Sequence, residues 1–466
     1  MNILWTKKEA MVATGGDAYG EWSVSGVSID TRELERGDLF VALKDIRDGH
    51  DFVGAALQAG AGAALVSRWP DGVAQDAPLL IVPDVLDGLT ALGLAARART
   101  KAKVIGITGS VGKTGTKEML RAAFQLQGKV HAAVRSFNNH WGVPLTLARM
   151  PKDTDFAVIE IGMNHPGEIG PLARIAQLDV AVITTVAAVH MEAFNCIDQI
   201  AEEKAAIFEG LSEGGVAVIN SDIPNLPVVQ KVRGAGRTIL FGQSEITDIR
   251  LVSAQATEHG SAVEAILHGN SILFKVGAPG QHLVMNGLAV LGTMEAVGGD
   301  VAKAMLALAS WRALSGRGQR FLVQIAGSGD TLELIDESYN ANPTSMKAAL
   351  AVLASATPQL DGSRVAFLGD MLELGPEELT LHAGLATCES MEQVDKVHTS
   401  GPLMVALHNA LPDHKRGRLF DLVSEMGASV NRLLDSGDVA MVKGSLGSKV
   451  GLVVAAIKSL GKTSEK

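Results

Sequence analysis

A glycine-rich segment at 108–115 has the residue types needed to hold the phosphate groups of a nucleotide. It reads TGSVGKTG. Glycines let backbone N–H groups approach phosphate oxygens, Lys113 adds a positive charge, and the Thr114 hydroxyl is a suitable Mg²⁺ ligand. The glycine that a strict phosphate loop has five residues before Gly112 would fall at Ile107, so this is the shorter form GxxGKT, and a plain turn is the alternative. The predicted phosphate-binding residues are Gly109, Ser110, Val111, Gly112, Lys113, Thr114 and Gly115.

Two polar side chains lie inside or at the end of apolar runs. Glu160 interrupts AVIEIG, and His190 ends AVITTVAAVH. An unpaired carboxylate is costly to bury, but at the carboxyl end of a parallel strand it can reach a magnesium ion. The alternatives are a buried ion pair for Glu160 and a hydrogen-bonded core position for His190. Because both follow strands near one phosphate loop, we expect them to belong to a metal site with Thr114.

A lysine follows on a predicted helix. Lys204 lies in IAEEKAAIF, where apolar residues recur at helical spacing. Its residue type and neighbours favour a solvated lysine paired with Glu202 or Glu203, as i,i+3 and i,i+4 charges are on many helix surfaces.

Two loops rich in amide side chains could contact a polar substrate. SFNNHWGVPLTL has Asn138 and Asn139 before a predicted helix, and IDESYNANPTSM has Asn340 and Asn342 after Asp336. Amides offer both donors and acceptors to a peptide, and a carboxylate at a strand end suits a ribose hydroxyl. Asx turns or plain structural loops are the alternatives.

Alternating strands and helices are predicted along most of the chain, so the fold class is α/β. Before residue 101 the predicted strands are 38–43, 63–66 and 78–82 and the helices are 52–60 and 86–103. In the middle, strands at 104–108, 156–161 and 180–189 and a helix at 116–127 predict a doubly wound sheet around the phosphate loop, followed by short strands within 240–275 and a helix at 280–297. After SGRG, strands at 332–336, 365–369, 396–400 and 439–443 predict a second parallel sheet, and 461–466 is expected to be a frayed tail.

The length of 466 residues supports about three domains. The predicted boundaries are 1–101, 102–314 and 315–466. The formal charge of −10 disfavours a general grip on nucleic acid, and the two cysteines, without a CxxC pattern, support neither disulfides nor a thiolate metal site. The first residues lack the zones of a signal peptide, and no apolar stretch reaches the roughly 18 residues of a membrane span. A cytoplasmic protein is expected.

Together these motifs resemble the Mur ligase family across nearly the whole chain. The resemblance implies a small α/β N-terminal domain that holds a UDP-sugar, a central P-loop-type ATPase sheet, and a Rossmann-like C-terminal sheet that closes over the nucleotide. The segment SIDTRELERGDLF is similar to the family's UDP-sugar segment, which implicates Asp30, Thr31 and Arg32.

The resemblance also implies roles for the residues named above. The segment at 109–115 would hold ATP, Thr114, Glu160 and His190 would hold magnesium, and Asn138, Asn139, Asn340 and Asn342 would contact substrate. Lys204 lies 204 − 190 = 14 residues after His190, which is the spacing of a carbamylated lysine in related ligases. The resemblance therefore implies a carbamylated Lys204 instead of a solvated lysine. It also implies two Mg²⁺ ions. Asn286 resembles an adenine-side asparagine, and Arg320 and Asp336 resemble contacts to phosphate and ribose. The implied catalytic residues are Lys113, Glu160, His190 and Lys204.

The stem ESYNANPTSM is similar to that of the family's member that joins D-alanyl-D-alanine to UDP-N-acetylmuramoyl-tripeptide, which implies an acyl-phosphate intermediate and, as we expect, a monomer. One departure is that Leu446 stands where an arginine is expected. Lys443, Ser445 and Lys449 remain candidates for the dipeptide carboxylate. Rival functions are a folate polyglutamylating ligase, a nucleotide-dependent switch and a nucleic-acid-stimulated ATPase.

Overall fold

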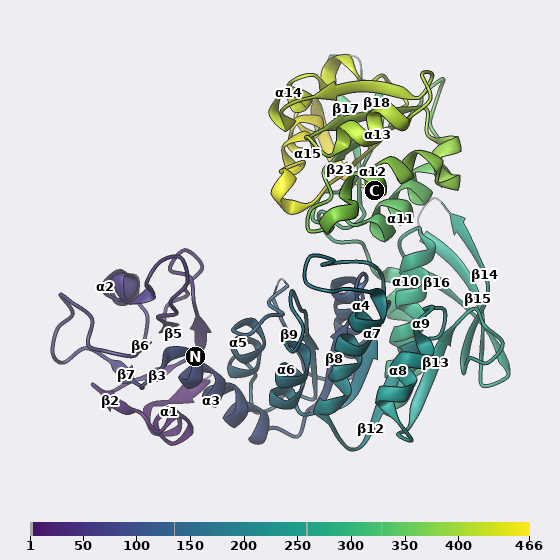
Figure 1. The fold of residues 1–466 in the computed structure, drawn as a ribbon. Helices are drawn as coiled ribbons and strands as arrows, with labels where there is room; N and C mark the ends of the chain where they lie inside the picture. The colour runs from purple at the N-terminus through teal and green to yellow at the C-terminus, as the bar shows by residue number, and fades with distance from the viewer. Residues whose placement is uncertain (1–2, 135, 258–259, 328) are drawn as a thin grey trace.

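In the part of the chain that the structure describes, three β-sheets of five, nine and seven strands follow one another, each packed against helices, and a two-stranded ribbon lies beside the first (Figure 1). The computed structural model describes residues 3–134, 136–257, 260–327 and 329–466. The three-domain α/β architecture predicted from the sequence is confirmed. Within the described residues, no helix combines the length and apolarity needed to cross a membrane.

The N-terminal sheet has the order β2-β7-β6-β5-β4, with only β2 antiparallel. Its strands are β2 (Asp17–Tyr19), β4 (Gly26–Ser28), β5 (Asp38–Val41), β6 (Ala63–Val66) and β7 (Leu79–Ile81), beside a ribbon of β1 (Trp5–Thr6) and β3 (Ser23–Val24). Its helices are α1 (Lys7–Thr14), η1 (Gly49–Phe52), α2 (Val53–Gln58) and α3 (Val85–Ala98). The helix predicted at 86–103 ends at Ala98 instead, because Lys103 already pairs as a strand with Phe156.

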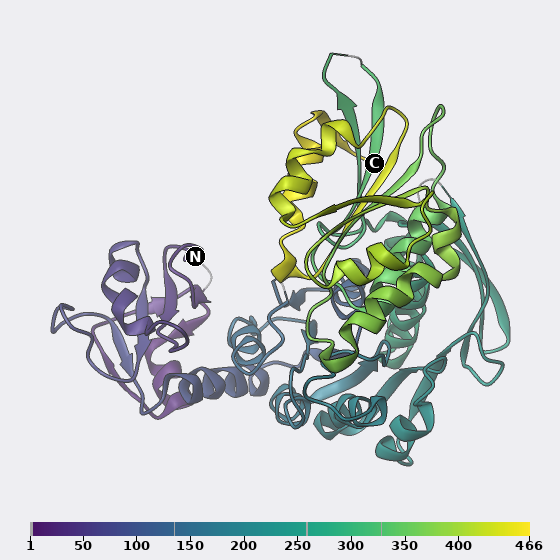
Figure 2. The same ribbon diagram turned by 45° about the horizontal axis from the view of Figure 1, so that its top comes forward.

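Helix α3 attaches this domain to the central one. Its apolar face, including Leu89, Leu92 and Ala96, shares one core with Leu145 and Ala148 of the central domain. The indole N–H of Trp5 adds a hydrogen bond of 2.9 Å to the Ala148 carbonyl. In both views the N-terminal domain extends from one side of the central domain, and the C-terminal domain packs above the central sheet (Figure 2).

The central sheet is parallel from β9 to β14 and continues as an antiparallel extension through β15 and β16. Its strands are β8 (Lys103–Thr108), β9 (Val130–Ala132), β10 (Phe156–Glu160), β11 (Leu178–Ile183), β12 (Leu211–Asn220), β13 (Thr238–Gly242), β14 (Ile249–Thr257), β15 (Gly260–Leu267) and β16 (Asn270–Val276). Helices α4 (Lys113–Gln125), α9 (Gln281–Ala296) and α10 (Val301–Ser310) cover one face. Helices α5 (Gly142–Ala148), α6 (Ile169–Ala176), α7 (Ile197–Ala205) and α8 (Leu226–Arg233), with η2 (Ala206–Gly210), cover the other.

Continuous apolar strands suit this sheet because both faces are buried. Along β8, Ile105 and Ile107 pack under α4 and α9 while Val104 packs toward α5 and α6. The strand predicted at 180–189 stops at Ile183, because the residues after it bond to the phosphate loop instead: the Ser110 N–H donates to the Thr185 carbonyl over 2.9 Å.

The C-terminal sheet has the order β21-β20-β19-β22-β18-β17-β23, and all neighbours from β21 to β18 are parallel. Its strands are β17 (Gln319–Ile325), β18 (Thr331–Glu337), β19 (Arg364–Gly369), β20 (Lys396–Ser400), β21 (Arg416–Phe420), β22 (Val439–Lys443) and β23 (Gly461–Glu465). Its helices are α11 (Pro343–Ser355), α12 (Glu378–Ala383), α13 (Met404–Ala410), α14 (Val423–Ala428) and α15 (Gly451–Lys458). The short turns are η3 (Gly375–Glu377), η4 (Gly384–Thr387), η5 (Glu389–Gln393), η6 (Val430–Arg432) and η7 (Leu446–Ser448).

The frayed tail predicted at 461–466 is wrong. These residues form β23, which pairs antiparallel with β17 from Phe321 to Ile325. The strand satisfies backbone groups that an edge strand would otherwise leave unpaired. Lys466 also pairs with the Glu333 carboxylate over 2.7 Å. The polar composition of this segment hid a pairing that depends on the distant strand β17.

Candidate active site

A cavity of about 570 Å³ lies between the central and C-terminal domains. Residues at the carboxyl ends of β8 and β10, and from the start of α9, line its central-domain side. Residues after β18 and β22 line the other side, as expected for ligand sites in open α/β sheets. Of the predicted residues, the cavity brings together Ser110, Val111, Gly112, Lys113, Thr114, Gly115, Asn138, Glu160, Asn286, Asn340 and Asn342.

The phosphate loop depends on two glycines with positive φ. Gly109 has φ +152° and Gly112 has φ +92°. A Cβ atom on Gly109 would lie 2.0 Å from the Thr184 hydroxyl, and one on Gly112 would lie 2.6 Å from Asn286 Oδ1. The loop is therefore packed too closely for any side chain at these positions.

The side chain of Lys113 folds back onto the backbone of the phosphate loop. Lys113 begins α4 and its ammonium donates to the Gly109 carbonyl over 2.6 Å. Burial lowers the pKa of Lys113, and Glu160 opposes that shift while Arg317 adds to it. Together with the free N–H groups at the start of α4, the site offers positive potential to a phosphate chain.

Oxygen atoms gather beside the start of α4. The Thr114 hydroxyl donates to Glu160 Oε2 over 3.0 Å and lies 3.2 Å from the Ser136 hydroxyl. Glu160 is 1% exposed, and it also accepts a hydrogen bond of 2.8 Å from the Asn138 amide. Hydroxyl and carboxylate oxygens are the donors that Mg²⁺ prefers, so this donor set fits that ion. Among the described residues, no three His, Cys, Asp or Glu side chains form a metal site by themselves, so phosphate oxygens would have to complete one.

Lys204 is buried rather than solvated, so the prediction from its helix pattern alone is wrong. The side chain is 2% exposed, and its ammonium lies 3.9 Å from Met163 Sδ. Burial lowers the pKa of Lys204 well below its usual value, and the charge of Lys113 adds to the shift. Glu203 turns away to cap α6, accepting N–H bonds from Gly167 and Ile169 over 2.7 and 2.8 Å.

His190 lies in the loop seven residues after β11 and not at the strand end expected from the apolar run. It has φ +54°, and its Nδ1 is 2.9 Å from Glu373 Oε2 of the C-terminal domain. Burial lowers its pKa, and Glu373 opposes that shift. The positive charges of Lys113 and Lys204 lower the pKa of His190 further.

Arg317 was not among the residues predicted from the sequence, but it lines the cavity. The predicted Arg320 does not line it. Arg320 is paired with Glu333 and lies outside the lining. Arg317 donates 3.1 Å to the Ser136 hydroxyl, and its guanidinium lies 3.9 Å from the Tyr339 ring centroid. Both arginines belong to SGRGQR, but Arg317 lies in the linker before β17 and lines the cavity, whereas Arg320 lies within β17.

Several predicted polar residues hold loops in place. Asp336 accepts from the Gly316 N–H over 3.0 Å and from the Ser338 hydroxyl over 2.6 Å, and it lies outside the lining. Asn139 accepts from the Gly142 N–H over 3.0 Å at the start of α5. Asn342 caps α11, but unlike Asn139 it also lines the cavity.

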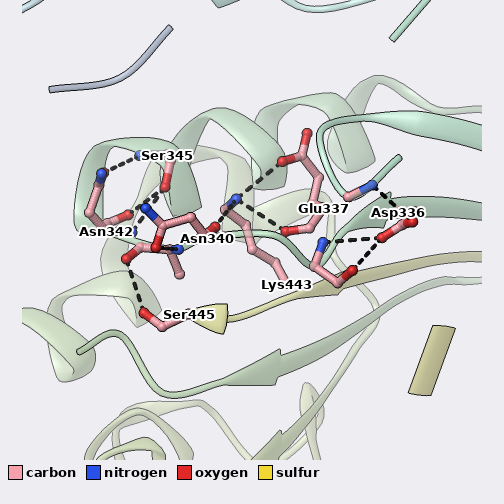
Figure 3. A network of polar contacts seen from close by, with 10 residues as sticks. Asp336, Glu337, Asn340, Asn342, Ser345, Lys443 and Ser445 are labelled. Carbon is pink, nitrogen blue, oxygen red and sulfur yellow. Dashed lines mark hydrogen bonds and ion pairs between the residues drawn. The ribbon is translucent and has the colours of Figure 1, made fainter. Parts of the chain in front are cut away.

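The three candidates for a carboxylate contact differ in their surroundings. Lys443 is 2% exposed and held between Glu337 Oε2 at 3.1 Å and the Asn340 carbonyl at 2.9 Å, as Figure 3 shows. Ser445 is bonded to the Ala341 carbonyl over 3.3 Å. Lys449 is exposed and, with Leu446, lines a smaller cavity of about 320 Å³ that shares Gly316, Tyr339 and Leu446 with the main one.

The predicted UDP-sugar residues lie apart from this cavity, in the N-terminal domain. Asp30, Thr31 and Arg32 follow β4, and Arg32 is bonded to both carboxylate oxygens of Asp30. None of the three lines the main cavity.

Comparisons with known proteins agree with this arrangement. The chain matches family models described as "Mur ligase middle domain" at residues 107–294 and "Mur ligase, glutamate ligase domain" at residues 320–446. It is 34% identical to the UDP-N-acetylmuramoyl-tripeptide–D-alanyl-D-alanine ligase of Bacillus subtilis, over 94% of this chain and 93% of that one. It is 36% identical to the Escherichia coli ligase of the same name, over 83% and 84%.

Solved structures give the same result. The crystal structure of MurF from Acinetobacter baumannii superposes with a TM-score of 0.85 at 27% identity, over 98% of this chain and 99% of that one. MurF ligase from Thermotoga maritima in complex with ADP has a TM-score of 0.78 at 26% identity, over 94% and 98%.

Proposed function

We propose, from the premise that this chain belongs to the Mur ligase family, that it is the ATP-dependent ligase joining D-alanyl-D-alanine to UDP-N-acetylmuramoyl-tripeptide. The product is the UDP-muramoyl-pentapeptide precursor of peptidoglycan. The observation that carries the proposal is the cavity between the two domains, which places a phosphate loop opposite the segment after β18. The relatives and the ADP complex named above support the nucleotide and both substrates.

The chemistry requires activation of a carboxylate. The γ-phosphoryl group of ATP passes to the terminal carboxylate of the tripeptide, which gives an acyl phosphate and ADP. The amine of the dipeptide, after losing a proton, attacks the acyl carbon, and phosphate leaves as the amide forms. Lys113, Arg317 and the start of α4 stabilise the negative charge on the transferring group, since positioned cations and N–H groups are the main source of rate in phosphoryl transfer.

Magnesium fits the oxygen donors beside α4, and we assign it to Thr114, Glu160, His190 and Lys204. When bound, the ions would neutralise charge on the phosphoryl oxygens. Lys204 would contribute as a carbamate, because a buried lysine with a lowered pKa is more often a neutral amine, the form that adds carbon dioxide. The carbamate carries a negative charge at a buried position, and a bound cation would offset the cost of burying that charge.

The substrate contacts extend this assignment. We propose that Asp30, Thr31 and Arg32 bind the UDP-sugar, that Asn138, Asn139, Asn340 and Asn342 border the peptide, and that Asn286 lies on the adenine side. We propose that Asp336 lies near the ribose because it accepts a hydrogen bond from Gly316 and holds that turn in place. We also propose that Arg317, and not Arg320, contacts the phosphate groups. We also propose domain boundaries at 1–101, 102–314 and 315–466. The same proposal includes a monomeric state and a cytoplasmic location.

For the carboxylate of the dipeptide we propose Lys449. Lys443 is already neutralised by Glu337, whereas Lys449 faces the smaller cavity that opens beside the main one. Lys449→Met should raise the KM for D-alanyl-D-alanine at least about 10-fold, the loss of a charged hydrogen bond, with little change in the KM for ATP. Lys462→Met, on the exposed side of β23, is the matched control. Equal KM values in both variants would exclude Lys449 from this role.

The test of the overall proposal is phosphate release with mass detection of the product. The purified protein is given Mg²⁺-ATP, UDP-muramoyl tripeptide and D-alanyl-D-alanine, and each component is omitted in turn. We expect release to require both substrates and to yield the pentapeptide. Release that ignores either substrate would refute this reaction and return the folate-type ligase or the nucleotide switch as explanations.

A further inference from the structure

Two loops from different domains meet beside the proposed metal site. The residues 190–192 follow β11, and the residues 370–375 follow β19. His190 Nδ1 lies 2.9 Å from Glu373 Oε2, and a Cβ atom built on Gly375 would lie 3.4 Å from the Met191 carbonyl. His190 and Glu373 both have left-handed backbone, with φ +54° and φ +62°. Such conformations are uncommon for residues with side chains and persist where neighbouring contacts hold them.

The contact decides which nitrogen of His190 is free. A carboxylate can only accept, so Nδ1 must carry the proton that bonds to Glu373. The Nε2 atom then keeps its lone pair. Histidines that bind metals usually donate the other ring N–H to a carboxylate, which holds the ring in one orientation and one tautomer. Glu373 supplies this partner from across the domain boundary.

The loop that carries Glu373 is also tied to the C-terminal side of the main cavity. The Leu372 N–H donates to the Ser445 hydroxyl over 3.0 Å, and the Ser445 N–H donates to the Asp370 carbonyl over 3.0 Å. Leu446, the next residue, lines both cavities. These two hydrogen bonds therefore connect the segment around Ser445 to the loop that carries Glu373.

We propose that Glu373 is a positioning residue, which turns His190 Nε2 toward the nucleotide site only when the C-terminal domain is docked. Glu373 thus links the segment that faces the second substrate to the metal-binding side of the central domain. This inference rests on the proposed role of His190 in holding a divalent ion.

Because Glu373 is exposed, its proposed effect on His190 can be distinguished from a contribution to protein stability. Its side chain is 62% exposed, and exposed ion pairs contribute little to stability. Glu373→Ala should therefore leave the melting temperature nearly unchanged. Glu373→Gln keeps an oxygen that accepts from Nδ1 and should retain part of the function. Glu377→Gln, on the same exposed segment, is the matched control.

The experiment measures Mn²⁺ binding in the presence of ADP by electron paramagnetic resonance, on the full chain and without turnover. We expect Glu373→Ala to weaken Mn²⁺ binding about 10-fold, as the loss of a partner behind a metal ligand does. We expect an intermediate value for Glu373→Gln and the parent value for Glu377→Gln. In a His190→Ala background, Glu373→Ala should cause no further loss, because it acts through the histidine.

Equal Mn²⁺ affinity in the parent and Glu373→Ala would overturn the inference, and so would losses that add in the double variant. If the parent bound no Mn²⁺ with ADP, the inference and the metal assignment of His190 would fall together. The ligase reaction is judged separately by pentapeptide formation. If the parent makes pentapeptide and binds Mn²⁺, and Glu373→Ala binds Mn²⁺ with the same affinity, only the role of Glu373 is refuted.

Discussion

At the residue scale, the half-buried Lys113 and the buried Lys204 determine the chemistry of the site. Lys113 and Lys204 are both buried enough for their pKa values to fall, and each lowers the pKa of the other or of His190. The positive form of each group is therefore disfavoured in the empty protein. For Lys113 the phosphate groups of a bound nucleotide would supply a counter-charge, and for Lys204 the proposed carbamate would replace the ammonium.

Arg317 and Arg320 give a direct test at this scale. Arg317→Ala should lower kcat roughly 100- to 1000-fold, because it removes a cation from the cavity that the phosphate loop lines, where the proposed phosphoryl transfer takes place. Arg320→Ala should instead cost roughly 1–3 kcal/mol of unfolding free energy by leaving the buried Glu333 with fewer partners. Steady-state kinetics and thermal unfolding of both variants separate the roles. A reversed pattern would restore Arg320 as the phosphate contact.

Lys204 predicts a signal that other lysines lack. With ¹³C-bicarbonate at pH 8, the protein should show a carbamate resonance by ¹³C NMR that is missing in Lys204→Met and retained when the exposed Lys231 is changed to Met. The lowered pKa keeps the amine neutral at lower pH than an ordinary lysine, so the resonance should fade only as the pH drops through that lowered pKa. Lys204→Met should also lose activity about 10- to 100-fold. A resonance that survives in Lys204→Met belongs to another amine.

At the element scale, the unit formed by β8, the phosphate loop and α4 is the most constrained part of the molecule. The strand is buried on both faces, the loop needs two glycines, and the helix starts at Lys113, three residues earlier than the sequence pattern predicted. The early start brings the free N–H groups and Lys113 to the same point. The loop is therefore closely packed against Thr184 and Asn286.

Gly112→Ala tests the effect of this close packing. The added Cβ would lie 2.6 Å from Asn286 Oδ1 in a backbone of φ +92°, so we expect ATP affinity to fall at least about 10-fold by calorimetry. Gly298→Ala is the matched control, because Gly298 has φ +71° but open space around it. The control should cost only the roughly 1–2 kcal/mol of the left-handed backbone and keep ATP affinity. Parent-like ATP affinity in Gly112→Ala would show that the loop and Asn286 can move apart without weakening nucleotide binding.

At the scale of the whole molecule, function depends on contacts between domains. The main cavity is lined from two domains, and the N-terminal domain is attached through α3 and through an ion pair between Glu9 and Lys152. The hydrogen bond from Lys152, followed by those from Thr6, lowers the pKa of Glu9 to about 2 from 4.5.

The attachment should therefore weaken in acid. Glu9 is ionised in the folded protein at pH values where it would be protonated in the unfolded chain, so its contribution is full above about pH 4.5 and is lost as the pH falls toward 2. Glu9→Gln should destabilise the protein at pH 6 by less than about 1 kcal/mol, because the pair is partly exposed, and by almost nothing at pH 2. Denaturant unfolding at both pH values, with Lys152→Met for comparison, checks this. A larger loss at pH 2 would contradict it.

Much of the fold was predictable because local patterns encode it. The strands at 63–66, 396–400 and 439–443 were predicted with the observed bounds, since continuous apolar runs identify buried parallel strands. The end of β11 and the pairing of β23 were not predictable, because both depend on bonds to segments far away in the chain.

The phosphate loop could be identified from the sequence alone, since its residues are contiguous and each acts through its own backbone or side chain. The α/β plan and, through several motifs taken together, the family could be identified in the same way. The folded structure was needed to show that Arg317 rather than Arg320 lines the cavity, that Lys204 is buried, and that His190 contacts Glu373. Burial and partner choice arise when distant segments pack together, and no spacing along the chain records them.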